Sequence, residues 1–356
     1  MNTIQVKLGK RSHSILIKQG LLKKIPALLN AKNKGQKWLI ISHYKLLELF
    51  GFTLMENLKK SGFKCEYITL PVGETAKSFI EYRRIVSQMV EMGCDRQTNI
   101  LCLGGGDVGD VGGYAAATYK RGINYYQIPT TLLAMVDSAL GGKTGINLSE
   151  GKNLIGHVYQ PRGIFIDPDL LNSLPPEELN AGLSEILKYG IIRDQDFFHT
   201  LLEELDTIDS FNYTSAIIHC CRIKAKIISR DETELDLRRI LNFGHTVAHA
   251  LEAYLGYGRI RHGEAVAYGM LSAGWISKKL GLLKDSEFTL MSQAIHKLPL
   301  PKLPPMDTAL LLPFIKMDKK NKHGNLNYIL LKGLGNAVIS KDVTEELILK
   351  SLKFLA

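Results

Sequence analysis

Cysteine is scarce in this sequence. There are five cysteines, an odd number, and no two of them form a C-x-x-C pair. The count argues against a disulfide framework, and the missing pair argues against a cysteine-type zinc site. We therefore expect reduced thiols in a cytoplasmic protein.

Long runs of apolar residues and long runs of basic residues are absent too. No apolar window reaches the length of a membrane helix, and the first residues alternate as strands do, without the apolar stretch of a signal peptide. Lysine and arginine number 45 against 35 acidic residues, a net charge of +10, but the basic residues are scattered. We expect no nucleic-acid or membrane partner, and the charge favours a focused site for small anions instead.

The hydrophobic periodicity of the sequence changes about halfway along the chain. Short apolar runs at 38–41, 64–70 and 99–103 alternate with helical periodicity at 44–60 and 79–92. This alternation predicts a parallel sheet flanked by helices.

The second half of the chain follows a helix start signal at Pro175-Pro176. Long amphipathic segments then dominate, at 177–192, 213–228 and 264–280. The 356 residues suffice for two domains. We expect an α/β domain over residues 1–170 and an all-α domain over 171–356, with the boundary near 168–176.

A glycine-rich loop follows the third strand of the first half. Residues 104–110 fit G-x-G-x-x-G, a strand–turn–helix at which a backbone approaches a diphosphate. A tight glycine turn without a ligand is the alternative, because no acid occurs between 111 and 136, where the dinucleotide-binding pattern expects one. Asp107 is unexpected here, since its carboxylate would repel a diphosphate. Downstream, Lys143 and Lys152 lie beside glycines and can reach a bound anion.

Three of the ten histidines fall between 245 and 262. His245 and His249 are four apart, which places both imidazoles on one face of a helix. The pair either holds a divalent metal together, or one holds metal while the other meets a ligand, or both are ordinary helical histidines. Glu185 would supply a third ligand, although three residues before Lys188 it also fits a helix ion pair. Thr246 occupies the place of the general-base glutamate in H-E-x-x-H, so a metalloprotease is not indicated.

Taken together, these ordered motifs resemble the 3-dehydroquinate synthase family over most of the chain, from about residue 73 to 320. The matching segments are Gly73-Glu74 with Lys77-Ser78, the glycine loop, 115–119 with Arg121-Gly122, 129–133, 142–144, 151–156, the helix of Glu185, 241–245 and 262–264.

The resemblance implies a fold, a reaction and its cofactors. The first domain would be a Rossmann-like nucleotide-binding domain and the second a metal-binding domain. The family cyclises 3-deoxy-D-arabino-heptulosonate 7-phosphate, a doubly anionic sugar phosphate, to 3-dehydroquinate and phosphate. NAD is used catalytically: a ring hydroxyl is oxidised, phosphate is eliminated, the ketone is reduced, and an intramolecular aldol closes the carbocycle. A divalent metal, zinc or cobalt, binds substrate hydroxyls.

The resemblance also implies site residues. The metal ligands would be Glu185, His245 and His262. The catalytic residues would be Lys143, Lys188, Glu234 and His249. The substrate-binding residues would be Arg121, Lys143, Asn153, Lys224, Arg238, Asn242, His249 and Lys319. The NAD contacts would come from Glu74, Lys77, Gly105, Gly106, Asp110, Thr130, Thr131, Asp137, Lys143 and Lys152. Arg121 matches an arginine that reaches a neighbouring subunit's site, so a homodimer is expected.

Five positions depart from the family pattern near the expected cofactor site. Asp107 stands where the family usually has Val, and Val72 where it usually has Asp. Ala76 replaces a common aromatic, and Ala139-Leu140 replaces a usual Ser-Ser. These departures predict either an altered NAD affinity or an Asp107 side chain that points away from the diphosphate.

Three alternative functions compete with this interpretation. A sister cyclase, such as a sedoheptulose 7-phosphate cyclase or 2-deoxy-scyllo-inosose synthase, would take a substrate without the carboxylate, but Arg238, Asn242 and His249 look like the shikimate-type set. A metal-dependent polyol dehydrogenase would usually carry an Asp as first ligand and lack the anion-binding lysines and arginine. A basic binding protein without catalysis would not need an intact ligand set and Lys143.

Overall fold

The computed structural model describes residues 1–29, 35–318 and 327–355. The chain divides into two compact units. One contains Met1–Pro175 and Ile217–Thr233, and the other contains Pro176–Ala216 and Glu234–Ala356. The long helix α8 (Tyr213–Arg230) therefore contributes most of its residues to the first unit.

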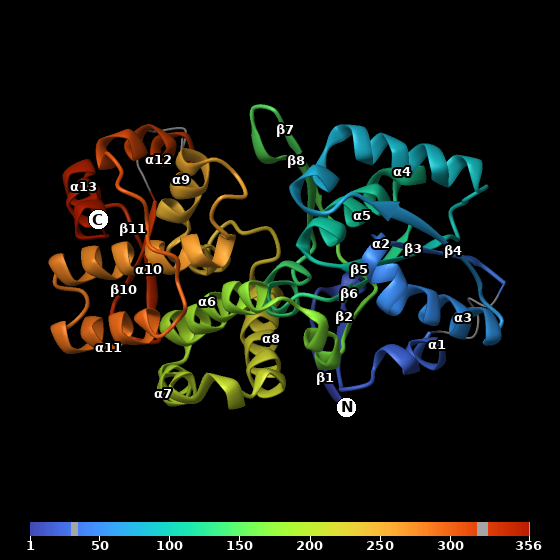
Figure 1. Cartoon of the computed structure of the whole chain (residues 1–356), viewed down its shortest axis with the longest axis horizontal. Coiled ribbons are helices and arrows are strands. Elements are labelled where there is room, and N and C mark those ends of the chain that lie inside the picture. The colour runs from blue at the N-terminus through green and yellow to red at the C-terminus, as the bar shows by residue number, and fades with distance from the viewer. Residues whose placement is uncertain (30–34, 319–326, 356) are drawn as a thin grey trace. The chain divides into compact units, whose positions relative to one another are not determined.

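The first unit is built on a seven-stranded sheet (Figure 1). The strands, in spatial order, are β1 (Asn2–Val6), β2 (His13–Ile17), β9 (Gly163–Ile166), β6 (Asn124–Pro129), β5 (Asn99–Gly104), β3 (Lys37–His43) and β4 (Lys64–Leu70). Only β1 and β2 pair antiparallel; the other neighbours are parallel. All six residues of β5 are buried, as expected for a central parallel strand covered on both faces.

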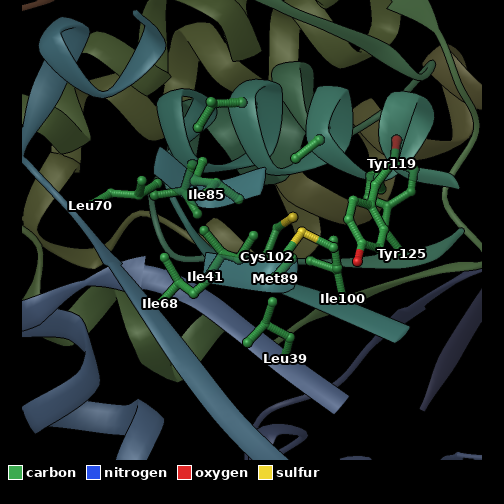
Figure 2. Packing of buried hydrophobic residues seen from close by; sticks show 14 of the residues in the cluster. Leu39, Ile41, Ile68, Leu70, Ile85, Met89, Ile100, Cys102, Tyr119 and Tyr125 are labelled. Atoms are coloured by element: carbon green, nitrogen blue, oxygen red, sulfur yellow. The ribbon is translucent and has the colours of Figure 1, made fainter. Parts of the chain in front are cut away.

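Helices cover this sheet. The main ones are α3 (Phe52–Lys60), α4 (Phe79–Glu91) and α5 (Gly106–Thr118), preceded by short segments α1 (Ile25–Leu28), α2 (Tyr44–Leu46) and the π-helix η4 (Leu47–Gly51). Figure 2 shows the core between α5 and the sheet, where Leu39 and Ile41 of β3 lie beside Cys102 of β5 and Met89 of α4. This packing fixes the ends of the parallel strands, and the segments that follow them carry residues that the sequence analysis expects at the cofactor.

Smaller elements of the first unit extend from these strand ends. A 3-10 turn, η5 (Gly73–Lys77), follows β4, and the π-helix η7 (Ala134–Ser138) follows β6. Strands β7 (Lys143–Leu148) and β8 (Gly151–Val158) form an antiparallel hairpin. Its residue Asn147 bridges to Ser78, directly after η5.

The second unit is mainly helical. Its helices are α6 (Pro176–Arg193), α7 (Gln195–Glu204), α9 (His245–Leu255), α10 (His262–Lys279), α11 (Asp285–His296), α12 (Leu312–Asp318) and α13 (Glu345–Leu355). Helix α10 packs against α6, α9, α11 and α13. A two-stranded hairpin, β10 (Tyr328–Leu331) with β11 (Ala337–Ser340), is the part that an all-helical expectation left out.

The predicted fold class is confirmed: a parallel α/β sheet is followed by a helix-rich part. The predicted strands at 38–41, 64–70 and 99–103 lie in β3, β4 and β5, and the helices predicted at 177–192 and 264–280 lie in α6 and α10. All five cysteines are buried free thiols. Within the described ranges, no helix is long and apolar enough to cross a membrane.

Candidate metal centre and cofactor site

The second unit brings Glu185, His245 and His262 together. One ligand atom from each lies within 4.8 Å of the others. Glu185 sits in the buried stretch of α6, while the two histidines are the first residues of α9 and α10. Two helix starts and one helix interior thus converge on a single point.

The distances fit a single divalent cation. His245 Nε2 lies 3.7 Å from Glu185 Oε1, and His262 Nε2 lies 3.8 Å from the same oxygen. Ligand bonds of about 2.1 Å in a tetrahedral site place ligand atoms roughly 3.4 Å apart. The fully buried Glu185 carboxylate accepts no hydrogen bond of good geometry from the described residues, although Lys188 Nζ forms an ion pair with it. A buried carboxylate in this state is suited to a cation.

Both histidines present the correct nitrogen. His245 Nδ1 lies 3.2 Å from the carbonyl oxygen of Phe243, and His262 Nδ1 lies 3.3 Å from Glu252 Oε2. When Nδ1–H donates to these acceptors, Nε2 keeps its lone pair toward Glu185. Burial, followed by the charge of Lys188, holds the pKa of His245 well below its usual value, so this ring is neutral, as a metal ligand must be.

Glycines allow the helices to approach closely enough for this arrangement. A Cβ on Gly263 would lie 1.9 Å from the carbonyl oxygen of Ala181, one turn before Glu185 on α6. A Cβ on Gly269 would lie 1.9 Å from the carbonyl oxygen of Gly244, the N-cap of α9. Because these glycines have no side chains, α10 packs directly against the elements that carry the other two ligands.

His249 lies beside the three ligands. Its ring centroid is 5.5 Å from that of His245 and 6.1 Å from that of His262. His249, Glu252 and His262 also form a possible ligand group. We assign Glu252 to orienting His262 instead, because His262 Nδ1 faces Glu252 while Nε2 faces Glu185.

A second polar cluster of this unit is organised by Glu234. Its carboxylate accepts a hydrogen bond from Asn242 Nδ2 and lies 3.9 Å from Arg238 Nε. Glu234 has a positive φ of 63°, an uncommon conformation for a residue with a side chain. Arg238 is 2% exposed and Lys188 is 1% exposed. Buried cations of this kind are rare unless they have partners.

The first unit gathers most of the expected cofactor residues at the carboxyl ends of β4, β5 and β6. Gly105 caps α5 and Gly106 begins it, so the backbone N–H groups of this helix start are available to an anion. Thr130 and Thr131 follow β6, and Thr130 N donates to the carbonyl oxygen of Gly104 over 3.0 Å. A Cβ on Gly106 would lie 2.9 Å from Ser138 Oγ, and one on Gly105 would be crowded by Asp107 Oδ1 at 3.1 Å and Thr131 Cγ2 at 3.3 Å.

A charged network connects η5 with α5 and the β7–β8 hairpin. Lys77 Nζ donates to Asp110 Oδ2 over 2.8 Å and to Asn153 Oδ1 over 2.6 Å. Glu74 pairs with Lys152 at 3.2 Å. Burial lowers the pKa of Lys77, but Asp110 and Glu74 outweigh it and the net pKa is raised, so this ammonium stays charged. Asn153, expected at the substrate, thus joins the cofactor residues.

The remaining expected residues are placed as follows. Lys224 donates to the carbonyl oxygen and to Oδ1 of Asp137, over 2.7 and 2.6 Å. Lys143 begins β7 and is exposed. Arg121 is exposed and has a positive φ of 69°. Lys319 lies outside the described residues.

Two residues that take part in these clusters, Glu252 and Asn147, were not predicted from the sequence. Glu252 stands three residues after His249 and seven after His245, so the helical spacing that singled out the histidines also pointed to it. Asn147 donates to Glu74 Oε2 over 2.6 Å and accepts from the backbone N–H of Asn153. No local pattern marks Asn147, because its partner Glu74 is distant in sequence.

Comparison with known proteins places this geometry in a family. The family model described as 3-dehydroquinate synthase N-terminal matches residues 67–181, and the one described as 3-dehydroquinate synthase C-terminal matches residues 182–321. A 3-dehydroquinate synthase from Crocosphaera subtropica is 41% identical over 99% of this chain and 98% of the relative.

Solved structures agree with this placement. A 2-deoxy-scyllo-inosose synthase bound to carbaglucose-6-phosphate, NAD+ and Co2+ superposes with a TM-score of 0.90 at 26% identity, over 99% of this chain and 100% of the other. The 2-epi-5-epi-valiolone synthase of Streptomyces hygroscopicus, with NAD+ and Zn2+ bound, gives 0.87 at 28% identity, over 96% of both chains.

Proposed function

This chain belongs to the 3-dehydroquinate synthase family, and we propose that it converts 3-deoxy-D-arabino-heptulosonate 7-phosphate to 3-dehydroquinate and phosphate, a step of the shikimate pathway to aromatic amino acids. It is a carbon–oxygen lyase that depends on NAD and on a divalent metal. The observation that best supports this reaction is the buried cation Arg238, which lies beside Glu234 in the same unit as the Glu185–His245–His262 group. A substrate that carries a carboxylate needs such a cation.

Each bound group supplies chemistry that the side chains lack. NAD, when bound, accepts a hydride from the substrate and returns it. The divalent cation, when held by Glu185, His245 and His262, acidifies a substrate hydroxyl and polarises the corresponding ketone. The residues of the chain then have to bind the two anionic ends, orient the ring and position protons.

We assign these tasks to the cationic and polar residues. Arg238 and Asn242, both held by Glu234, are suited to the substrate carboxylate, because guanidinium and amide N–H groups match its two oxygens. Lys143, Asn153, Lys224 and Lys319 would hold the phosphate. A phosphate held in this way acts as the base for its own elimination. Lys188 and His249, beside the ligands, would position protons at the ring hydroxyls.

The remaining cofactor assignment concerns NAD. Its diphosphate would lie at the start of α5, next to Gly105 and Gly106, with Thr130 and Thr131 nearby. The network of Glu74, Lys77, Asp110 and Lys152 would bind the rest of the cofactor, with Asp137 and Lys143. We accordingly propose residues 1–170 as the NAD-binding domain and 171–356 as the metal- and substrate-binding domain.

Phosphate release tests the proposal. Purified protein with NAD and Zn2+ or Co2+ should release phosphate from the heptulosonate phosphate, and the product should be 3-dehydroquinate. Sedoheptulose 7-phosphate, which lacks the carboxylate, is the matched control and should turn over at least about a hundredfold more slowly, because a buried charged contact is left unpaired. Equal turnover of the two substrates would identify a sister cyclase instead.

We also propose a homodimer in which Arg121 completes the partner's site. The exposure of Arg121 and its positive φ support this role, since strained backbone conformations concentrate at functional sites. Arg121→Ala and Glu185→Gln proteins should each be inactive, and mixing them through unfolding and refolding should restore activity. No recovery would mean that Arg121 acts within its own subunit. The free thiols of all five cysteines support a cytoplasmic location.

A further inference from the structure

Asp107, the acid at the start of α5, is bound by protein donors on several sides. Its Oδ2 accepts from His43 Nε2 over 2.8 Å and from the backbone N–H of Gly73 over 3.2 Å. Its Oδ1 accepts from the backbone N–H of Val108 over 2.9 Å. The carboxylate therefore connects three elements: the end of β3, the turn η5 and the N-terminus of α5.

The turn η5 has no cap from its own N-cap position. That position is Val72, which makes no side-chain cap hydrogen bond and is 77% exposed. Aspartate is among the best N-cap residues, and valine is among the poorest.

We propose that Asp107, oriented by His43, is a positioning residue of the NAD site that caps the turn Gly73–Lys77, whose own N-cap residue Val72 provides no side-chain cap. The turn carries Glu74 and Lys77, two of the proposed NAD contacts, and Asp107 fixes it against the start of α5. This inference rests on the proposed cofactor site. It explains why a carboxylate is tolerated beside the glycine loop.

Charge balance around the pair supports this role. The Asp107 carboxylate lies in the first turn of α5, where the helix dipole favours negative charge. Burial lowers the pKa of His43, but the hydrogen bond and the charge of Asp107 outweigh it, and the net pKa is raised. Lys77 adds a further positive charge near Asp107, and Asp110, which pairs with Lys77, adds a negative one. With His43 as its direct partner, the Asp107 carboxylate repels a diphosphate less than a free carboxylate would.

Helix and sheet geometry explain why these residues meet. Strands β3 and β5 are parallel neighbours, with Ser42 opposite Leu103, so His43 and the glycine loop leave the sheet at the same edge. Dinucleotide-binding folds place a ribose-binding acid at the end of the strand next to the glycine-loop strand. In this chain the neighbouring strand is β3, which ends in His43 and not in an acid. The carboxylate that contacts His43 is that of Asp107, at the start of α5.

Five variants test the proposal by NAD binding in the absence of substrate. Asp107→Val should weaken NAD binding roughly tenfold, the effect of losing one charged hydrogen bond. The double variant V72D/D107V should recover to within about threefold of the original chain, because a carboxylate introduced at position 72 can cap the turn locally. V72D alone is the control and should bind NAD normally. His43→Ala should weaken NAD binding by itself but add little in the D107V background.

Titration calorimetry gives the Kd for NAD, and thermal unfolding reports the fold of each variant. In turnover assays the KM for NAD should rise with D107V while kcat at saturating NAD changes little. Equal or tighter NAD binding by D107V would overturn the proposal, as would a stable V72D/D107V protein that shows no recovery. If D107V does not fold, the proposal is tested by His43→Ala and V72D/D107V. Weaker NAD binding by His43→Ala together with near-normal binding by V72D/D107V supports the proposal, and normal binding by His43→Ala overturns it. Normal NAD binding without turnover would refute the proposed function and leave this inference intact.

Discussion

At the scale of single residues, the candidate metal centre is organised by two groups outside its proposed ligand set, one a side chain and one a backbone carbonyl. Glu252 and the carbonyl oxygen of Phe243 accept from the Nδ1 atoms of His262 and His245. Each acceptor fixes which nitrogen faces Glu185, and so holds the ring in a ligating tautomer before any cation arrives. The ligand group is thus preorganised by its neighbours.

Glu252→Gln should therefore weaken metal binding about 10- to 100-fold without removing a ligand. Equilibrium dialysis with Co2+ would give the affinity, and the visible spectrum of the Co2+ form should still indicate nitrogen and oxygen ligands. Glu203→Gln, on the exposed side of α7, is the control and should bind Co2+ normally. Unchanged affinity in Glu252→Gln would show that Glu252 does not orient His262.

The His43–Asp107 pair predicts a pH-dependent contribution to stability. The folded pKa of His43 is raised above its usual 6.5, so its stabilisation is fully present below that value and is lost as the pH rises through the folded pKa. His43→Gln keeps a hydrogen-bond donor but removes the charge. It should lower the free energy of unfolding by roughly 1 kcal/mol at about pH 6 and by much less at about pH 9. Urea unfolding at both pH values measures this difference, and an equal loss at both would contradict the charged pair.

At the scale of elements, the position of α10 determines where the ligands meet. Its glycines at 263 and 269 let it touch the backbone of α6 and the start of α9, which carry Glu185 and His245. Small residues in helix contacts usually serve close packing alone. Here the same contact also sets the distance between the ligands.

Gly269→Ala should consequently disturb both stability and metal binding. The added methyl group would meet the carbonyl oxygen of Gly244, a backbone atom that cannot move alone, and we expect a loss of about 1–3 kcal/mol in the free energy of unfolding with weaker Co2+ binding. Gly274→Ala on the same helix is the control, since its methyl group meets the flexible end of Met291 and otherwise makes an ordinary contact with Phe288 at 3.4 Å. It should bind Co2+ normally. Equal Co2+ affinity in both variants would exclude the proposed role of Gly269.

Some of these helices and strands were predictable from the sequence, and others were not. Strands β3, β4 and β5 and helices α6, α8 and α10 followed from apolar periodicity, because those segments bury one or both faces in a regular way. The β7–β8 hairpin was not predicted, since its second strand is largely exposed and carries little apolar alternation. The π-helix η4 interrupts the helix expected over 44–60, and no local pattern marks it.

The site was predictable to a similar degree. The resemblance implied Glu185, His245 and His262 as metal ligands and Lys188 as a catalytic residue, and the structure brings the first three within 4.8 Å of one another. The partners of Asp107 were not predicted, because His43 and Gly73 belong to different strand ends and only the folded sheet brings them to one edge. Contacts between distant segments remain beyond sequence periodicity.

At the scale of the whole molecule, the chain combines a nucleotide-binding sheet with a helical metal centre, and the proposed reaction uses both. The oxidation and the reduction cancel, so NAD serves as a true catalyst. A polyol dehydrogenase, by contrast, consumes one NAD for each substrate oxidised. This difference separates the two classes more sharply than any fold comparison.

The most direct test is therefore the stoichiometry of product to NAD. The heptulosonate phosphate is supplied in large excess over NAD and enzyme, and phosphate, 3-dehydroquinate and reduced nicotinamide are followed together. We predict many molecules of phosphate and 3-dehydroquinate for each NAD, in equal amounts, without net accumulation of reduced nicotinamide. Reduced nicotinamide formed in proportion to substrate consumed, or no phosphate release with NAD and metal present, would contradict the account.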